Sequence, residues 1–266
     1  MDLQLKDKTA LVTGSSGGIG FAIAELLLKE GAIVYINGRT QKRVDEALSK
    51  LQSAASMAGA KAHGIVADLG TAAGADVVFK ALPNVDILVN NVGIYEPKPF
   101  EQITDEDWTR IFDVNVMSGI RLSRHYFGGM LKRNWGRIIF VSSESGVNIP
   151  KEMIHYGVTK TAQIAVARGL AELTAGTKVT VNSVLPGPTA SEGVEEFVEN
   201  MAKQGKTNKQ SVEKEFFETV RPSSLIKRFA TSEEVANLVA YVASPLSSAT
   251  NGAALRVDGG VVRSIV

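Results

Sequence analysis

The feature that most constrains the fold is a glycine-rich segment near the N-terminus. Residues 9–13 form a short apolar run, and residues 14–20 read Gly-Ser-Ser-Gly-Gly-Ile-Gly. An apolar helical pattern follows over 21–30 and ends at Gly31, and a second apolar run covers 33–37. A strand, a glycine-rich turn, a helix and a second strand within about thirty residues are typical of a dinucleotide-binding βαβ unit.

The glycine spacing, Gly14-x-x-x-Gly18-x-Gly20, differs from the commoner Gly-x-Gly-x-x-Gly. Its physical role is the same, because glycine permits a tight turn and a close backbone approach, and a helix N-terminus offers free N–H groups to a pyrophosphate. The alternative is a plain turn without a ligand. The residues that we expect to contact a dinucleotide here are Gly14, Ser16, Gly18, Ile19 and Gly20.

The alternation of strand and helix continues along the chain. Further strands are expected at 60–67, 85–89, 137–141, 179–184 and 253–257, and helices at 40–58, 72–82, 104–133, 232–243 and in the run that follows Tyr156. This order predicts one α/β domain over 1–266, with a doubly wound, seven-stranded parallel sheet of the Rossmann type. A charged helical excursion at about 191–225, with Phe197, Phe216 and Phe217 as apolar points, is typical of a lid or substrate loop.

Composition excludes several classes of function. The chain of 266 residues has a net charge of +1, which gives no strong field toward nucleic acid or an anionic membrane. It has no cysteine, and its three histidines are scattered, so we expect no disulfide, thiolate or metal site. There is no apolar signal core at the N-terminus and no run long enough to span a membrane. A cytoplasmic protein is the default expectation.

The end of the second strand favours NADP(H) over NAD(H). An acidic residue there would bind the ribose 2′-hydroxyl, but the chain has Asn37-Gly38-Arg39. Arg39 could instead bind a 2′-phosphate through two parallel charge-assisted hydrogen bonds. The alternative is that Arg39 is a surface residue and Thr40 caps the next helix. Asp68 and Leu69, which follow the third strand, are expected to hold the adenine ring.

Tyr156 and Lys160 are four residues apart in a helical pattern, so their side chains share one helix face. A fixed positive charge favours the phenolate and lowers the pKa of a tyrosine, which would give a proton donor and acceptor suited to neutral pH. Such a pair also arises by chance in surface helices. Its significance therefore depends on the other motifs of the chain.

These motifs together resemble the short-chain dehydrogenase/reductase family, in its single-domain form, over essentially the whole chain. They are Thr13-Gly14-x-x-x-Gly18-Ile19-Gly20, Asn90-Asn91-Val92-Gly93, Asn115, Ser143, Tyr156, Lys160 and Pro186-Gly187. The step of thirteen residues from Ser143 to Tyr156 is also that of the family. Val92 stands where the family most often has alanine, and the excursion at 191–225 is somewhat long.

The resemblance implies a role for each of these residues. Tyr156 would be the general acid/base, Lys160 would lower its pKa and hold the nicotinamide ribose, and Ser143 would position the substrate oxygen. Asn115 would anchor a water through which Lys160 exchanges protons with solvent. The remaining cofactor contacts that it implies are Asn90 and Gly93 at the ribose and Pro186, Gly187 and Thr189 at the nicotinamide. A homotetramer is expected on the same ground.

Neighbouring polar residues are weaker candidates. His155 points about 100° away from Tyr156 around a helix, so a place on the pocket wall or the surface is expected. Ser142 should face the other side of the strand end from Ser143. Glu144 could contact either substrate or solvent.

The sequence therefore predicts an NADP(H)-dependent oxidoreductase that transfers hydride between nicotinamide and a small carbonyl or secondary alcohol substrate. Alternatives are an NAD-linked dehydrogenase, a non-catalytic redox sensor, which would be free to lose the catalytic set, and an epimerase or dehydratase on the same scaffold. The expected pocket wall suggests an apolar or mixed substrate. Its residues are Ile94, Tyr95, Ile149, Met153, Pro188 and Phe197.

Overall fold

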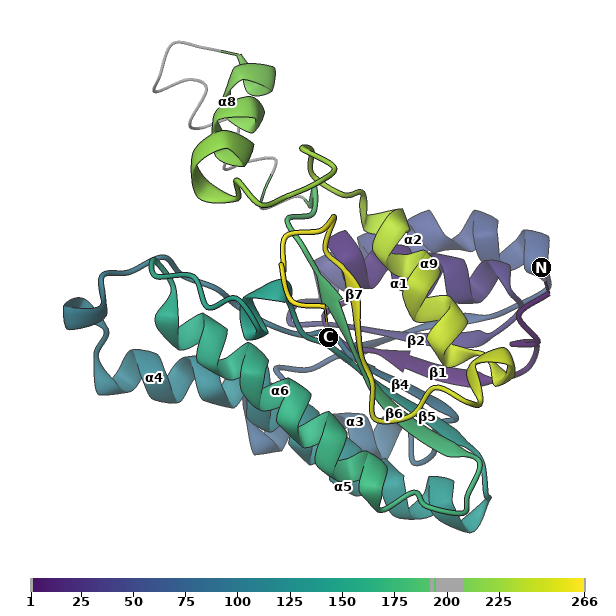
Figure 1. The fold of residues 1–266 in the computed structure, drawn as a ribbon. Coiled ribbons are helices and arrows are strands. Elements are labelled where there is room, and N and C mark those ends of the chain that lie inside the picture. The colour runs from purple at the N-terminus through teal and green to yellow at the C-terminus, as the bar shows by residue number, and fades with distance from the viewer. Residues whose placement is uncertain (1, 192–193, 195–207, 266) are drawn as a thin grey trace.

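A single parallel sheet organises the computed structural model, which describes residues 2–191, 194 and 208–265 (Figure 1). The strand order is β3-β2-β1-β4-β5-β6-β7, and every neighbouring pair is parallel. The order reverses between β1 and β4, which confirms the predicted doubly wound topology. The strands are β1 (Thr9–Val12), β2 (Ile33–Gly38), β3 (Ala62–Val66), β4 (Ile87–Asn90), β5 (Gly136–Val141), β6 (Val179–Pro186) and β7 (Ala254–Val257).

Helices cover both faces of the sheet (Figure 1). One apolar core lies under α1 (Gly18–Lys29), α2 (Gln41–Ala58) and α9 (Ser232–Ala243). The other lies under α3 (Ala72–Ala81), α5 (Ser118–Lys132) and α6 (Ile154–Glu172). The central strands are buried on both sides, which is why they read as continuous apolar runs in the sequence.

The helix expected over 104–133 is divided. Thr104 caps α4 (Asp105–Phe112) through a reciprocal pair of hydrogen bonds with Asp107, and a π-helical turn, Asp113–Met117, separates α4 from α5. The turn contains Asn115, whose side chain is hydrogen-bonded outside its own helix. A π-helical turn of this kind often marks a functional position.

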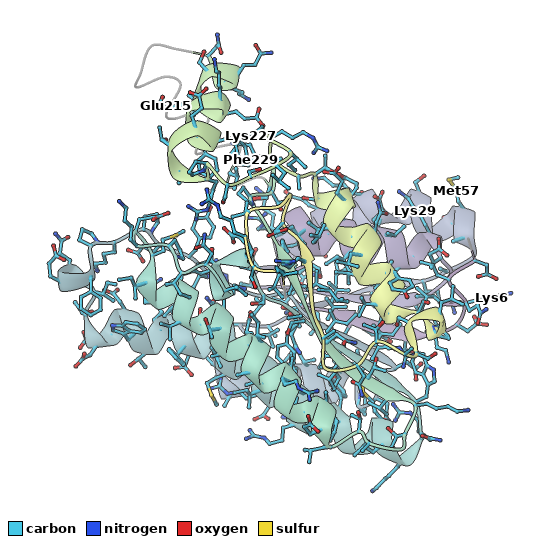
Figure 2. The ribbon with its side chains drawn as sticks, viewed as in Figure 1. Lys6, Lys29, Met57, Glu215, Lys227 and Phe229 are labelled. Atoms are coloured by element: carbon cyan, nitrogen blue, oxygen red, sulfur yellow. The ribbon has the colours of Figure 1, made fainter. Side chains whose placement is uncertain are left out.

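The described part of the excursion projects from the carboxyl edge of the sheet (Figure 1). It contains α8 (Lys209–Glu215) and a π-helical turn, Phe216–Val220. The rings of Phe216, Phe217 and Phe229 pack at centroid distances of 5.1–5.2 Å, and Figure 2 shows Phe229 at the foot of this unit. Phe197 lies outside the described residues. Across the described helices, none is long and apolar enough to cross a membrane.

Candidate active site

The glycine-rich turn connects β1 to α1 at the carboxyl edge of the sheet. Gly14 and Gly18 have φ angles of +58° and +56°, a region that favours glycine. A Cβ atom on Gly20 would lie 2.4 Å from Nδ2 of Asn91 and 2.6 Å from the carbonyl oxygen of Gly14. These glycines are therefore required by the shape of the turn.

Side chains from two other strand ends hold this turn in place. Oδ1 of Asn37 accepts a hydrogen bond from the backbone N–H of Gly14 at 3.2 Å. Nδ2 of Asn91 donates to the carbonyl oxygens of Thr13 and Gly14 at 2.9 and 3.0 Å. These supporting roles of Asn37 and Asn91 could not be predicted from sequence, because each depends on a contact between distant parts of the chain.

The geometry fits a dinucleotide. The N-cap residue of α1 is Gly17, which has no side chain to cap the helix, so the first N–H groups of α1 are available to a pyrophosphate. Arg39 is exposed directly after β2, and a Cβ atom on Gly38 would lie 3.2 Å from Cβ of Ser16. Thr40 precedes α2, but its side chain makes no capping hydrogen bond. After β3, Asp68 is exposed and Leu69 is buried.

The catalytic candidates meet where β5 ends and α6 begins. Ser143 follows β5, and Tyr156 and Lys160 lie on the first turns of α6. Nζ of Lys160 lies 5.6 Å from the centroid of the Tyr156 ring and donates hydrogen bonds to the carbonyl oxygen of Val141 at 3.0 Å and to Oε1 of Gln163 at 3.2 Å. The expected cluster of Ser143, Tyr156 and Lys160 is therefore present in the structure.

Burial dominates the ionisation of this pair. It raises the pKa of Tyr156 above its ordinary value, although Ser143 and Arg221 act in the opposite direction. Burial also lowers the pKa of Lys160 to about 8. The lowering of the tyrosine pKa that we expected from Lys160 is not seen, because desolvation and the Glu144 carboxylate raise the pKa of Tyr156 by more than Ser143 and Arg221 lower it. A phenol with a raised pKa stays protonated at neutral pH, which is the form that donates a proton.

Asn115 and Gln163 link α6 to the π-helical turn. Oδ1 of Asn115 accepts from the N–H of Ile94 at 2.7 Å, and its Nδ2 donates to Oγ1 of Thr159 at 3.0 Å. Nε2 of Gln163 donates to the carbonyl oxygen of Asn115 at 2.5 Å, while Oε1 of Gln163 accepts from Lys160. The Gln163 side-chain amide thus connects the backbone of Asn115 to Nζ of Lys160. No sequence motif indicated a role for Gln163.

Three other polar residues face away from the reacting position. Oγ of Ser142 donates a hydrogen bond to the carbonyl oxygen of Lys160 at 2.8 Å. Ser142 therefore attaches α6 to the end of β5, beside Ser143. His155 is buried, and its ring lies 5.9 Å from that of Trp108 on α4. Nδ2 of Asn90 donates to Oγ of Ser123 at 3.2 Å. The Asn90 side chain, expected at the cofactor ribose, is therefore directed toward α5.

The nicotinamide end of the predicted cofactor site is formed by two loops. A Cβ atom on Gly187 would lie 2.5 Å from the carbonyl oxygen of Asp258, so only glycine fits after Pro186. Oγ1 of Thr189 donates to the carbonyl oxygen of Gly187 at 2.9 Å. On the other loop, a Cβ atom on Gly93 would lie 3.5 Å from Nζ of Lys160. Gly93 therefore adjoins Lys160.

A buried ion pair lies beside Ser143. Oε2 of Glu144 accepts hydrogen bonds from Oγ of Ser143 at 2.5 Å and from the N–H and Oγ of Ser145. Oε1 of Glu144 accepts from Nε of Arg221 at 3.1 Å, and Nη1 of Arg221 donates to Oε1 of Glu152 at 3.1 Å. The Glu144 and Arg221 side chains are 5% and 11% exposed. Of the apolar or mixed substrate that the sequence suggested, this ion pair favours the mixed one.

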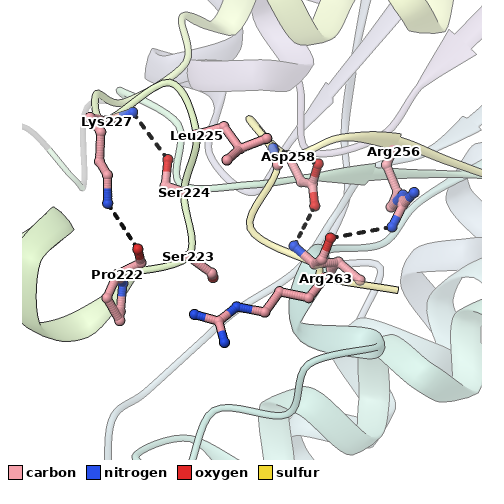
Figure 3. A pocket seen from close by; sticks show the side chains of 10 residues that line it. Pro222, Ser223, Ser224, Leu225, Lys227, Arg256, Asp258 and Arg263 are labelled. Atoms are coloured by element: carbon pink, nitrogen blue, oxygen red, sulfur yellow. Dashed lines mark hydrogen bonds between the residues drawn. The ribbon is translucent and has the colours of Figure 1, made fainter. Parts of the chain in front are cut away.

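A separate hollow of about 780 Å³ lies between segment 222–227 and the C-terminal segment (Figure 3). The Asp258 carboxylate accepts hydrogen bonds from the N–H groups of Gly260 and Val262 there. Among the described residues, its lining includes neither Ser143, Tyr156 nor Lys160. This hollow is therefore distinct from the candidate active site.

Comparison with known proteins shows the class that this fold and site define. The family model described as short chain dehydrogenase matches residues 8–202, and the chain belongs to that family. It is accordingly an oxidoreductase that uses a nicotinamide dinucleotide.

The relatives match this chain over nearly their whole length. The uncharacterized oxidoreductase YvaG of Bacillus subtilis (strain 168) is 48% identical over 265 residues, with 100% of both chains covered. D-beta-hydroxybutyrate dehydrogenase of Cupriavidus necator is 31% identical, over 97% of this chain and 99% of the relative. The crystal structure of L-sorbose reductase from Gluconobacter frateurii, complexed with NADPH and L-sorbose, is similar with a TM-score of 0.92, 30% identity and 100% coverage of both chains.

Proposed function

We propose that this protein is an NADP(H)-dependent oxidoreductase that interconverts a small carbonyl compound and the corresponding secondary alcohol. The observation that carries the proposal is the convergence of Ser143, Tyr156 and Lys160 at the carboxyl edge of β5, with the glycine-rich turn at the same edge of the sheet. Ligands bind at this edge in open α/β sheets. A non-catalytic sensor would have no need of the complete catalytic set.

Each residue has a distinct task in the proposed reaction. A bound nicotinamide supplies the hydride donor or acceptor. Tyr156 donates a proton to the substrate oxygen during reduction and accepts it during oxidation. Ser143 orients that oxygen, and Lys160, held by Val141 and Gln163, provides positive charge behind the phenol and a donor for the cofactor ribose. Gly14, Ser16, Gly18, Ile19 and Gly20 form the pyrophosphate cradle.

The preference for NADP(H) rests on the end of β2. Positions 37–39 offer no carboxylate to a ribose 2′-hydroxyl, and Arg39 is exposed where it can reach a 2′-phosphate. The NADPH complex of the sorbose reductase relative is consistent with this choice. Fluorescence titration should show tighter binding of NADPH than of NADH, and Arg39→Ala should reduce the difference by at least about tenfold. Equal affinity in the wild type would contradict the preference.

Turnover tests the reaction class. NADPH oxidation with a panel of aldehydes and ketones should be detectable and should balance the alcohol formed. Conversion of a substrate without net cofactor turnover would favour an epimerase or dehydratase. Binding of NADPH without turnover of any substrate would favour a sensor. We further propose that the excursion at 191–225 acts as the substrate loop, while the homotetramer and the cytoplasmic location stay predictions.

A further inference from the structure

Two separate segments bring charge to the substrate side of Tyr156, and a third brings a tyrosine ring. Glu144 and Glu152 belong to the connection between β5 and α6, and Arg221 follows the π-helical turn of the excursion. Tyr95, from the loop after β4, lies edge-on to Tyr156 with a centroid distance of 6.2 Å. Glu144 is also hydrogen-bonded to Ser143. This set, which we call the charged wall, therefore adjoins the position of the reacting oxygen.

The charged wall offers both hydrogen-bond donors and acceptors. Nε and Nη1 of Arg221 are used by the two carboxylates, and within the described residues Nη2 has no hydrogen-bond partner. Oε1 of Glu144 accepts one hydrogen bond, from Arg221, whereas Oε2 accepts hydrogen bonds from Ser143 and Ser145. A hydroxyl group can donate to a carboxylate and accept from a guanidinium. An apolar substrate would bury these groups without replacing the hydrogen bonds of water.

The balance of charge also distinguishes neutral from anionic substrates. One guanidinium, that of Arg221, faces the two carboxylates of Glu144 and Glu152. Of the nearby cations, Lys98 is paired with Asp107 and Arg110 with Glu96, and Lys151, which precedes Glu152, is exposed at the surface. Lys160 is held by Val141 and Gln163 behind Tyr156. A substrate carboxylate or phosphate would meet an excess of negative charge on this wall, which is unfavourable.

We propose that the substrate is a neutral polyhydroxylated ketone, or the matching polyol, whose hydroxyl groups next to the reacting carbon bind Glu144, Glu152 and Arg221. This inference rests on the proposed function and narrows its substrate class. Glu152 is the most suitable probe because its side chain is 38% exposed, so its replacement leaves the buried pair intact.

The test compares six-carbon ketones with NADPH: the ketohexose stereoisomers, 5-keto-D-gluconate and 2-hexanone. The wild-type enzyme should have its highest kcat/KM with a ketohexose, at least about tenfold above the other two classes. Glu152→Gln should lower the ratio of kcat/KM for the ketohexose to kcat/KM for 5-keto-D-gluconate, chiefly by raising the kcat/KM for the keto acid. Glu25→Gln, which removes a carboxylate from the distal part of α1, should leave the margin unchanged.

The possible failures separate the two proposals. The proposed substrate class would be overturned if the kcat/KM for 2-hexanone or 5-keto-D-gluconate equalled or exceeded that of every ketohexose. The proposed oxidoreductase function would still stand. Absence of turnover of all ketohexoses by a protein that binds NADPH and reduces another carbonyl would do the same. Failure to bind NADPH or NADH would instead remove the proposed function itself.

Discussion

The two halves of the carboxyl edge of the sheet, around β1 and β2 and around β5 and α6, use different kinds of chemical group. Around β1 and β2, the predicted pyrophosphate site consists of glycines, backbone N–H groups and uncharged amides such as Asn37 and Asn91, and Arg39 is exposed beyond it at the end of β2. Around β5 and α6, the predicted substrate site contains the buried charged groups Glu144 and Lys160 and the partly buried Arg221. The first half achieves its shape by leaving side chains out, and the second by placing charged groups against one another at a cost in desolvation.

The largest stability effect is expected from breaking the buried ion pair. Arg221→Met leaves Glu144 without its guanidinium partner and should lower the free energy of unfolding by about 3 kcal/mol, measured by urea denaturation. The double variant Arg221→Met, Glu144→Gln should recover most of this loss because no unpaired charge remains. A double variant as unstable as the single one would show that the charge pairing is unimportant.

A comparable effect should appear in the pH dependence of stability. Burial lowers the pKa of Lys160 to about 8 in the folded protein, against an ordinary value of 10.5. Between these two pH values the Lys160 amine is protonated in the unfolded chain and neutral in the folded protein. The free energy of unfolding should therefore rise between about pH 8 and 10.5, by roughly 3 kcal/mol relative to Lys160→Met. Below about pH 8 the buried Lys160 amine is charged, so the folded protein bears the full desolvation cost of that charge. Parallel stability curves for the two proteins would contradict the assignment.

A single added methyl group should disrupt the glycine-rich turn of the predicted cofactor site. Gly20→Ala places a Cβ atom 2.4 Å from the Asn91 amide and 2.6 Å from the Gly14 carbonyl, and should weaken NADPH binding at least about hundredfold. Gly128→Ala is the matched control, since nothing lies within 4 Å of its Cβ position on α5. The control should be neutral or slightly stabilising. Calorimetric titration and thermal unfolding distinguish lost binding from lost folding.

The smallest effect concerns Gln163. Gln163→Glu places a carboxylate beside Nζ of Lys160 and should move the alkaline limit of kcat/KM upward by about one pH unit. Gln163→Leu removes the acceptor and should move it downward. Because a purely structural role would lower activity without moving the pH profile, unchanged profiles in both variants would exclude an influence on Lys160.

The same difference explains what could be predicted from sequence. The glycine turn, the alternation of strands and helices and the Tyr156–Lys160 pair are local patterns, and the fold and family that they indicated are confirmed. Arg221 lies 77 residues from Glu144 and 69 from Glu152, so no local pattern brings them together. The π-helical turn at Asn115 was also not predicted, because it depends on hydrogen bonds to Ile94 and Thr159. Desolvation at Tyr156 likewise follows from packing rather than sequence spacing.

The central claim is that Tyr156 transfers the proton in a nicotinamide-dependent reaction. The most direct measurement is NADPH oxidation with a substrate identified in the carbonyl panel, for the wild type and for Tyr156→Phe, with NADPH affinity measured on both. We expect kcat to fall by about 10³-fold while the dissociation constant for NADPH changes little. Turnover by Tyr156→Phe at the wild-type rate would contradict the account.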